Sequence, residues 1–524
     1  MNEALKNAYL LSFNDPNDVR AGTSYVKAEN FNFLIGGSGS LNFSKDIRIF
    51  SGLKQGENAF GTSVVGGRVH SVCSIYGFIG GGFCNVISGL NTTIGGGCNN
   101  CAIGNNAIIG GGRCNCAIGN NTIIGGGHYN IACGVSSTIG GGCSNRAPGN
   151  NATVGGGCLN CACATGTVAG GAVNLAEGNF ATVGGGRCNL ARCSNSTVGG
   201  GFGNRASAIN ATIGGGNYNN ACCNNSTVGG GRYNNAEGCS TTVGGGYRNR
   251  ICIGADSTIG GGRFNCICSC ESVIAGGISN SIGCCAETST IGGGVSNNIC
   301  GPNSTIGGGG SNLICTSCCG SAGFATIGGG CSNKITTCHE IPICLSFIGG
   351  GGLNCISNAG TCCCNNVSTS FSAIVGGRCN SIISQHCGSC CCDGKPAIFS
   401  FIGGGTGNAI DSSYSTIGGG SNNKVFADYG YIPGGRLSTI IPGHTGAAIL
   451  GDGQNRAHNS SGPHTLTLDF ISGTYIKNKA FIQNDSYIPS SYTSFGVSGQ
   501  LTFDSNYFYR HNGTNWTRTA MSIW

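Results

Sequence analysis

Residues 93–104 read Thr-Ile-Gly-Gly-Gly-Cys-Asn-Asn-Cys-Ala-Ile-Gly, and residues 108–119 read Ile-Ile-Gly-Gly-Gly-Arg-Cys-Asn-Cys-Ala-Ile-Gly. The phrase recurs along most of the 524-residue chain, usually at intervals of 15 residues. A fixed short period of this kind indicates a solenoid, in which each repeat forms one coil. The Ile or Val before the glycines marks 23 coils, at positions 64, 79, 94, 109, 124, 139, 154, 168, 183, 198, 213, 228, 243, 259, 274, 291, 306, 327, 348, 374, 402, 417 and 432.

The columns of the repeat indicate two short strands in each coil. The residue before the Ile or Val is usually Thr, and the one before that is usually Ser, Ala or Thr. Eight residues after the Ile or Val stands Ala in ten consecutive coils and then Ile in nine. This period-2 alternation, broken by Gly and Asn, is typical of short strands joined by tight corners. We therefore predict an all-β fold, a parallel β-roll or β-solenoid of about 23 coils with a small C-terminal β domain.

Two columns are expected to form the corners. Asn stands six residues after the Ile or Val in 21 consecutive coils. It tolerates the left-handed backbone of a tight turn, and stacked Asn side chains can bond from coil to coil. The Gly triplet lacks the Lys-Ser/Thr of a phosphate-binding loop, which favours a corner or a close approach of backbones between chains. The Asn ladder is expected to begin with Asn85, Asn100, Asn115, Asn130, Asn145 and Asn160.

The composition excludes several classes of protein. Collagen is excluded because the 102 Gly are not at every third position and Pro numbers only 9. The net charge of +7 is spread without a Lys/Arg stripe, so we expect no nucleic-acid partner. No apolar run of about 18 residues is present, so we expect no membrane span. Without a nucleophile elbow, a His-Glu-x-x-His motif, a P-loop or a recurring carboxylate pair, we expect no enzyme activity and no cofactor.

The thin core predicts an oligomer. Each coil offers its interior one Ile or Val, one Ala or Ile and a few small residues. Their burial contributes about 3–4 kcal/mol, whereas ordering the backbone costs about 1–2 kcal/mol per residue. We therefore predict lateral packing, as a homotrimer. With coils about 4.8 Å apart, 23 coils would form a rod about 110 Å long.

All 38 Cys lie between residues 73 and 392, in the variable columns of the repeat. Several recur in one column of adjacent coils, which would bring their Cα atoms within reach of a disulfide. The alternative is that these cysteines are small surface residues that stay reduced. The disulfide candidates are Cys101 with Cys116, Cys143 with Cys158, Cys252 with Cys268, and Cys300 with Cys315.

A metal site is a further interpretation of the cysteines. The spacing of the repeat loosens over residues 310–400, where we expect inserted loops, and thiols crowd in these loops. Thiolate-rich clusters bind Zn²⁺ or Cu(I), although paired Cys-x-x-Cys motifs at a fixed separation are missing. The candidate ligands are Cys362, Cys363, Cys364, His386, Cys390, Cys391 and Cys392.

The two ends differ from the repeat. Residues 1–60 are expected to form an N-terminal attachment or cap segment, and their first twenty residues lack the pattern of a secretory signal. Residues 61–440 form the expected rod. Residues 441–524 contain alternating segments and are expected to form a β domain, either a tip or a trimerisation unit. The candidate tip residues are Tyr507, Tyr509, Trp516 and Trp524.

Two segments resemble known families. Asp-Ser-Asn-Tyr-Phe-Tyr at 504–509, followed by Trp-Thr-Arg-Thr-Ala-Met-Ser-Ile-Trp at 516–524, resembles the closing segment of many bacteriophage tail-fibre and other virion proteins. The 15-residue units resemble the head repeats of trimeric autotransporter adhesins, from which they differ in period and in the Gly triplets. This second resemblance implies a trimeric left-handed parallel β-roll.

These observations lead to three functional hypotheses. The first is a trimeric fibre or appendage of a phage or virus, on the virion surface or extracellular, whose C-terminal tip binds a host cell-surface glycan or protein. The second is a structural filament or decoration protein, stacked end to end and cross-linked by disulfides. The third is ice binding by the outward Thr column, although β propensity alone also favours Thr there. That column includes Thr93, Thr138, Thr153, Thr182, Thr197 and Thr212.

Overall fold

The structure is a computed structural model in which the chain divides into two units, Met1–Ile47 and Arg48–Trp524. The described residues all belong to the second unit, and their regular elements are all β-strands. Within them, no helix has the length and apolarity to cross a membrane. The described ranges are 54–55, 62–315, 323–336, 345–358, 371–384, 397–451, 457–469, 501–503, 507–511 and 514–520.

Each coil contributes two short strands. The first strands are even-numbered, from β2 (Ser63–Val64) to β46 (Tyr431–Ile432), and each consists of the repeat's Ile or Val and the residue before it. The second strands are odd-numbered, from β3 (Ser71–Val72) to β45 (Lys424–Val425), and begin seven residues after that Ile or Val. They hold two residues, except for four longer ones. These are β35 (Leu313–Cys315), β37 (Lys334–Thr336), β39 (Cys355–Asn358) and β41 (Ser381–Ser384).

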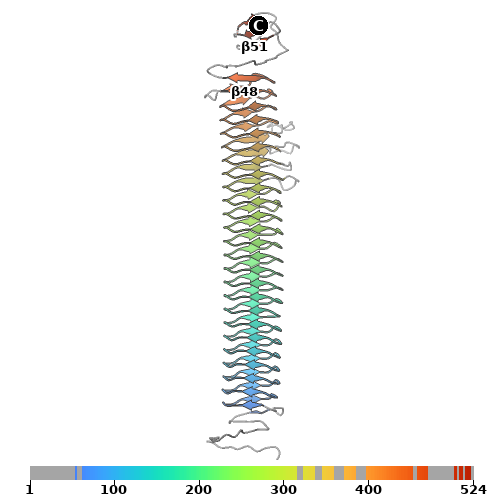
Figure 1. Ribbon diagram of the computed structural model, residues 1–524, viewed down its shortest axis with the longest axis vertical. Helices are drawn as coiled ribbons and strands as arrows, with labels where there is room; N and C mark the ends of the chain where they lie inside the picture. Colours follow the sequence, from blue (N-terminus) through green and yellow to red (C-terminus); the bar gives the residue numbers. More distant parts are fainter. Residues whose placement is uncertain are drawn as a thin grey trace, which may run out of the picture. The chain divides into compact units, whose positions relative to one another are not determined.

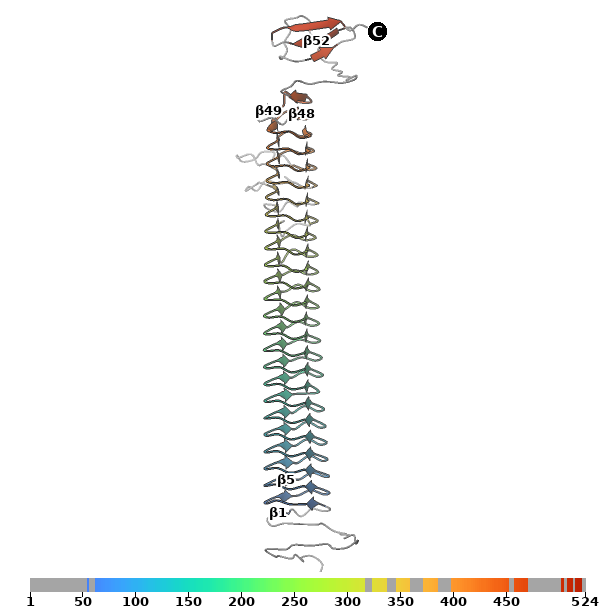
Figure 2. The same ribbon diagram turned by 60° about the vertical axis from the view of Figure 1, so that its left-hand side comes forward.

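Successive coils stack in parallel and in register. Ile94 pairs with Ile109 in the first sheet, and Ala102 with Ala117 in the second. A third line of parallel bridges runs four residues after the Ile or Val, as between Cys98 and Arg113. The two sheets contain 25 strands each, and Figures 1 and 2 show the coils lying one above another. The prediction of a parallel β-solenoid with a 15-residue repeat is confirmed.

The sheets continue beyond residue 440, where the repeat phrase ends. Tyr431 pairs with Ala448, and Ala448 in turn pairs with Leu466. Ile449 takes the buried place that the repeat's Ile holds in earlier coils. The two sheets therefore extend beyond the last coil that carries the Gly and Asn columns. The added strands are β1 (Lys54–Gln55) at the start, then β47 (Ser438–Ile440), β48 (Ala448–Gly451), β49 (His458–Asn459) and β50 (Leu466–Asp469) at the end.

Three columns fill the interior between the sheets. Ile109, Ala117 and, two residues before Ile109, Ala107 are all fully buried, and the same positions are buried in other coils. Because alternate strand residues point to opposite faces, the neighbours of these residues face outward. The core is thus a narrow strip of apolar side chains that runs the length of the stack, edged by a buried column that is Ala in some coils and Ser or Thr in others, as at Thr122 and Ser137.

The Asn column forms a buried ladder of side-chain hydrogen bonds. The side-chain N–H groups of Asn100 donate to the carbonyls of Gly96 (3.0 Å) and Gly112 (2.9 Å). The backbone N–H of Asn100 donates to Oδ1 of Asn85 (3.0 Å). Each side chain therefore satisfies groups in its own coil and in the following coil, and the backbone N–H of each Asn is satisfied by the side chain of the preceding coil. At the end of the ladder, the backbone N–H of Ser438 donates to Asn423 (3.0 Å).

These Asn residues do not adopt the left-handed conformation that the sequence led us to expect. The left-handed position is one residue earlier, at Asn99 (φ 54°) and Cys114 (φ 54°), and again near the end of each coil, as at Asn106 (φ 56°). The Asn of the ladder is held instead by its three bonded partners. Because varied residue types occupy the left-handed positions, the sequence does not mark them.

The three glycines of the triplet differ in what they require. A Cβ on Gly95 would collide with the carbonyl of Gly110, and one on Gly97 (φ +90°) with the carbonyl of Gly112. These close approaches are between coils of one chain, rather than between chains. The middle glycine, Gly96, has no atom within 4 Å of a built Cβ. Its place is nevertheless Gly in all 23 coils. We call this column the middle-glycine strip.

A separate antiparallel sheet lies near the C-terminus of the sequence. It consists of β51 (Leu501–Phe503), β52 (Tyr507–His511) and β53 (Trp516–Ala520). Tyr509 pairs with Arg518, and His511 with Trp516. The tip candidates Tyr507, Tyr509 and Trp516 therefore lie on adjacent strands, whereas Trp524 lies outside the described residues.

The Asn ladder can be tested with two substitutions in one coil. Asn219→Ala removes donors to Gly215 and Gly231 (both 2.9 Å) and the acceptor for the backbone N–H of Asn234 (2.9 Å). Leaving these buried groups unpaired should lower the free energy of unfolding by about 3 kcal/mol. Urea denaturation and hydrogen exchange of neighbouring amides measure the change.

Asn217→Ala is the matched control, because Asn217 is exposed and its φ is not left-handed. We expect a change below about 0.5 kcal/mol there. Equal effects of the two substitutions would contradict the role assigned to the ladder.

Candidate functional site

The outward face of the second sheet carries the best-defined cluster of reactive side chains. Residues seven and nine after the Ile or Val flank the buried eighth residue, so their side chains share this outward face. Cys occupies these two columns repeatedly, as at Cys101, Cys133, Cys161 and Cys163. The Sγ atoms of Cys161 and Cys163 are 3.7 Å apart.

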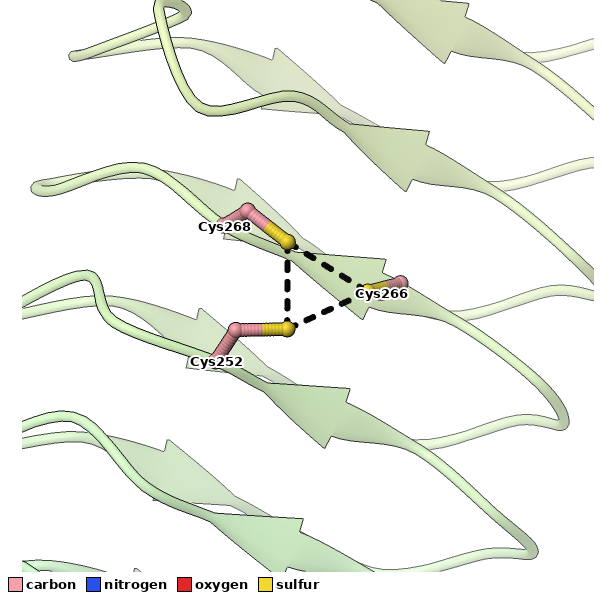
Figure 3. A group of neighbouring side chains, drawn as sticks. All are labelled: Cys252, Cys266 and Cys268. Carbon is pink, nitrogen blue, oxygen red and sulfur yellow. Dashed lines mark hydrogen bonds between the residues drawn. The ribbon is translucent and has the colours of Figure 1, made fainter.

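Three thiols converge where two such coils meet. Cys266 is the first residue of β29 (Cys266–Ile267), Cys268 follows that strand, and Cys252 follows β27 (Arg250–Ile251) in the preceding coil. The Sγ–Sγ distances are 3.7 Å for Cys252–Cys266, 3.8 Å for Cys266–Cys268 and 3.1 Å for Cys252–Cys268. Figure 3 shows the three sulfurs turned toward one another. We call this group the thiol triad.

The backbone ladder fixes the triad in place. The N–H of Cys252 donates to the carbonyl of Ile267 (2.8 Å), and the N–H of Cys268 donates to the carbonyl of Ile282 (2.9 Å). Arg250 is paired in register with Cys266. The three thiols are partly buried, and their positions follow from strands that are themselves held on both sides.

Burial and one neighbouring cation act on the triad in opposite directions. Burial raises the pKa of Cys266 to about 11, and the Arg250 guanidinium opposes that rise. Burial also raises the pKa of Cys268. Arg250 donates from Nη2 to Oε2 of Glu237 (2.9 Å), so the cation beside the triad is also paired with a carboxylate. Cys266 and Cys268 are therefore thiols at neutral pH rather than thiolates.

The disulfide candidates from the sequence lie as neighbours in adjacent coils. None of their eight cysteines forms a disulfide in this structure: Cys101, Cys116, Cys143, Cys158, Cys252, Cys268, Cys300 and Cys315. Cys143 and Cys158 are bridge partners. A hydrogen bond from Cys300 lowers the pKa of Cys315 to about 6.

One disulfide joins a pair that the sequence interpretation missed. Cys223 and Cys239 are bonded, with a Cα–Cα distance of 4.9 Å. They stand ten and eleven residues after their respective Ile or Val, so they do not share a column. The sequence predicted pairs within one column, whereas the stacked corners bring these two cysteines together from different columns.

The metal ligands expected in the inserted loops lie outside the described residues. These are Cys362, Cys363, Cys364, His386, Cys390, Cys391 and Cys392. Among the residues that the structure describes, the thiol triad is the group of three metal-ligating side chains whose ligand atoms lie within 4.8 Å of one another. Its third member, Cys266, was missed because it stands in a different column from Cys252 and Cys268.

A stripe of aromatic rings follows the corner beyond the Gly triplet. Ring centroids are 5.0 Å apart for Phe202–Tyr218, 5.3 Å for Tyr218–Tyr233, 6.2 Å for Tyr233–Tyr247 and 5.4 Å for Tyr247–Phe264. These rings stand four or five residues after the Ile or Val of successive coils. The Arg248 guanidinium lies 5.3 Å from the centroid of Tyr247. We call the five ring residues, Phe202, Tyr218, Tyr233, Tyr247 and Phe264, the aromatic stripe. The sequence alone did not mark these aromatic positions, because the residues four and five after the Ile or Val vary in type from coil to coil.

Comparison with known proteins adds no family assignment. The chain matches no protein-family model, and no curated protein matches it in sequence.

Cys101 and Cys116 share a column of the repeat and a hydrogen bond, and this pair gives a pH-dependent prediction. A hydrogen bond from Cys116 lowers the pKa of Cys101 to about 7, whereas that bond and burial raise the pKa of Cys116. Because the thiolate is the nucleophile, alkylation of Cys101 in reduced protein should reach half its maximal rate near pH 7. Cys116→Ala removes the donor, and the rate at pH 7 should fall about tenfold. Peptide mass spectrometry after timed iodoacetamide labelling measures the rate.

Cys116→Ser is the matched variant, because its hydroxyl still donates and should preserve most of the effect. Exposed Cys188 in another coil serves as an internal standard. A pH profile of Cys101 that is the same in the Ala variant as in the native protein would contradict this assignment.

Proposed function

We propose that this chain is the shaft of a trimeric fibre or appendage of a phage or virus, on the virion surface or extracellular. The C-terminal β strands would serve as a tip that contacts a host cell-surface glycan or protein, and the chain would have no enzyme activity. The observation that supports a rod is the in-register stack of two 25-stranded sheets. At about 4.8 Å per coil, 24 intervals give a shaft about 115 Å long.

The middle-glycine strip supports lateral association of copies. Within one chain, Gly200 and Gly215 have open space where a Cβ would be, and their φ values lie outside the left-handed range. At these two positions nothing in the chain itself requires Gly, which is explained if another backbone approaches the column closely. In five other coils φ also favours Gly, at values from 151° to 158°: Gly81, Gly141, Gly185, Gly293 and Gly404. Exposed apolar side chains lie two or three residues further on, including Leu159 (56%), Tyr218 (45%) and Leu353 (52%). A neighbouring copy would bury both columns.

Two substitutions in the middle-glycine strip test the trimer. Gly200→Val together with Gly215→Val adds side chains only to the outer surface of the coil. We expect the variant to keep its β circular dichroism but to sediment as a monomer in analytical ultracentrifugation, while the native chain sediments as a trimer.

Gly201→Val is the contrasting variant, since its Cβ would collide with the carbonyl of Gly216 at φ +91°. It should disrupt the fold locally whatever the oligomeric state. A native chain that sediments as a monomer, or a trimer that tolerates both middle-glycine substitutions, would contradict the proposed packing.

A filament built by end-to-end stacking is the second candidate function. Its supporting observation is β50, which pairs with β48 as the last strand of the first sheet among the described residues. Leu466 of β50 is 60% exposed. An edge strand with exposed apolar side chains is a template for another chain.

Electron microscopy separates the two candidates. The fibre hypothesis predicts discrete rods with a shaft about 115 Å long, whereas the filament hypothesis predicts continuous fibres of variable length. Removal of residues 470–524 should leave the rods intact and abolish their binding to host cells. Rods of the truncated protein that still bind would contradict the assignment of a C-terminal tip.

A further inference from the structure

We propose that Cys252, Cys266 and Cys268 bind one Cu(I) ion as a three-coordinate thiolate complex. This inference is independent of the fibre hypothesis, because it rests on the geometry of two adjacent coils and not on the oligomer or the tip.

The sulfur triangle has the dimensions of such a site. A metal ion about 2.3 Å from each of three sulfurs, and in their plane, requires sulfur–sulfur separations of about 4.0 Å. Two sides of the triangle, at 3.7 Å and 3.8 Å, are close to that value. The third side, Cys252–Cys268 at 3.1 Å, needs to open by about 0.9 Å. Small rotations about the Cα–Cβ bonds provide this, while the backbone stays in its ladder.

The donor set selects the kind of ion. Thiolates are soft ligands that favour Cu(I), Zn²⁺ and iron–sulfur clusters. Structural Zn²⁺ is almost always bound by four ligands, whereas the described residues bring only three ligating side chains together here. Cu(I) is stable with three thiolates in a plane. The number and type of the donors therefore favour Cu(I).

A disulfide accounts for the triad less well. A Cys252–Cys268 bond would leave Cys266 as an unpaired thiol beside it. Cys266 is nearly equidistant from both partners, at 3.7 Å and 3.8 Å. In contrast, the bonded pair Cys223–Cys239 consists of two cysteines only. The third sulfur is the feature that a metal ion explains.

Charge at the triad is partly balanced by a fixed cation. Three thiols release three protons to solvent as Cu(I) binds, no electron is transferred, and the complex carries two negative charges. The Arg250 guanidinium acts electrostatically on both Cys252 and Cys266. Glu237 also pairs with this guanidinium, at 2.9 Å.

The test maps which cysteines of the full chain are protected from labelling when copper binds. The protein is reduced, transferred to argon and titrated with Cu(I) supplied as its acetonitrile complex. It is then labelled with N-ethylmaleimide and mapped by peptide mass spectrometry, which separates the triad from the other 35 cysteines. We expect all three triad thiols to label without copper and to become protected together, about tenfold or more, as one equivalent binds. Exposed Cys188 and Cys331 should still label.

The decisive variant is Cys266→Ser, which keeps the other two thiols in place. Protection of Cys252 and Cys268 should weaken at least about tenfold in this variant, and Cys188→Ser should behave as the native chain does. Unchanged circular dichroism shows that the fold is kept, and Cys266→Ala provides a second variant.

Three outcomes would overturn the proposal. The first is protection of Cys252 and Cys268 that persists in both Cys266 variants, which indicates a two-sulfur site. The second is a Cys252–Cys268 pair that resists labelling without copper after reduction. The third is Zn²⁺ that protects the triad and is not displaced by an equal concentration of Cu(I).

Discussion

The hydrogen bonds between the backbones of successive coils are the constraint on which the rest of this structure depends. The N–H of Gly95 donates to the carbonyl of Ile109 (2.9 Å), and that of Cys101 donates to the carbonyl of Asn115 (2.8 Å). Bonds of this kind recur from coil to coil and place each residue above its counterpart in the previous repeat. Residues that share a column of the repeat therefore lie in a line along the stack, and their side chains are neighbours in adjacent coils.

The stacked columns explain how so thin a core can be ordered. Each coil buries only a few small side chains, but the Asn ladder satisfies the polar groups of its corner, and close Gly contacts let the backbones approach. The same stacking brings reactive side chains together. The interval from Val243 to Ile259 is 16 residues, yet Arg250 still pairs with Cys266. The extra residue is accommodated in the corner after Cys252, so the thiol triad keeps its register.

The repeat period was sufficient to predict the fold, because a 15-residue phrase with two alternating segments admits few other structures. Three features of the structure could not be predicted from the repeat period. The last coils lack the phrase, so Ile449 and the strands around it were not recognised as part of the stack. The left-handed corners accept many residue types, such as Cys114. The triad draws Cys266 from a different column than Cys252, and only the shared outward face of the sheet brings the two together.

Fibre diffraction from oriented rods tests the in-register stack most directly. If each coil lies above the previous one, the pattern should show a strong meridional reflection near 4.8 Å, the spacing of hydrogen-bonded strands along the rod. The corresponding reflection on the equator should be weak. A 4.8 Å reflection on the equator would mean that the strands run along the rod axis rather than across it, and the stacked coils described above would then be wrong.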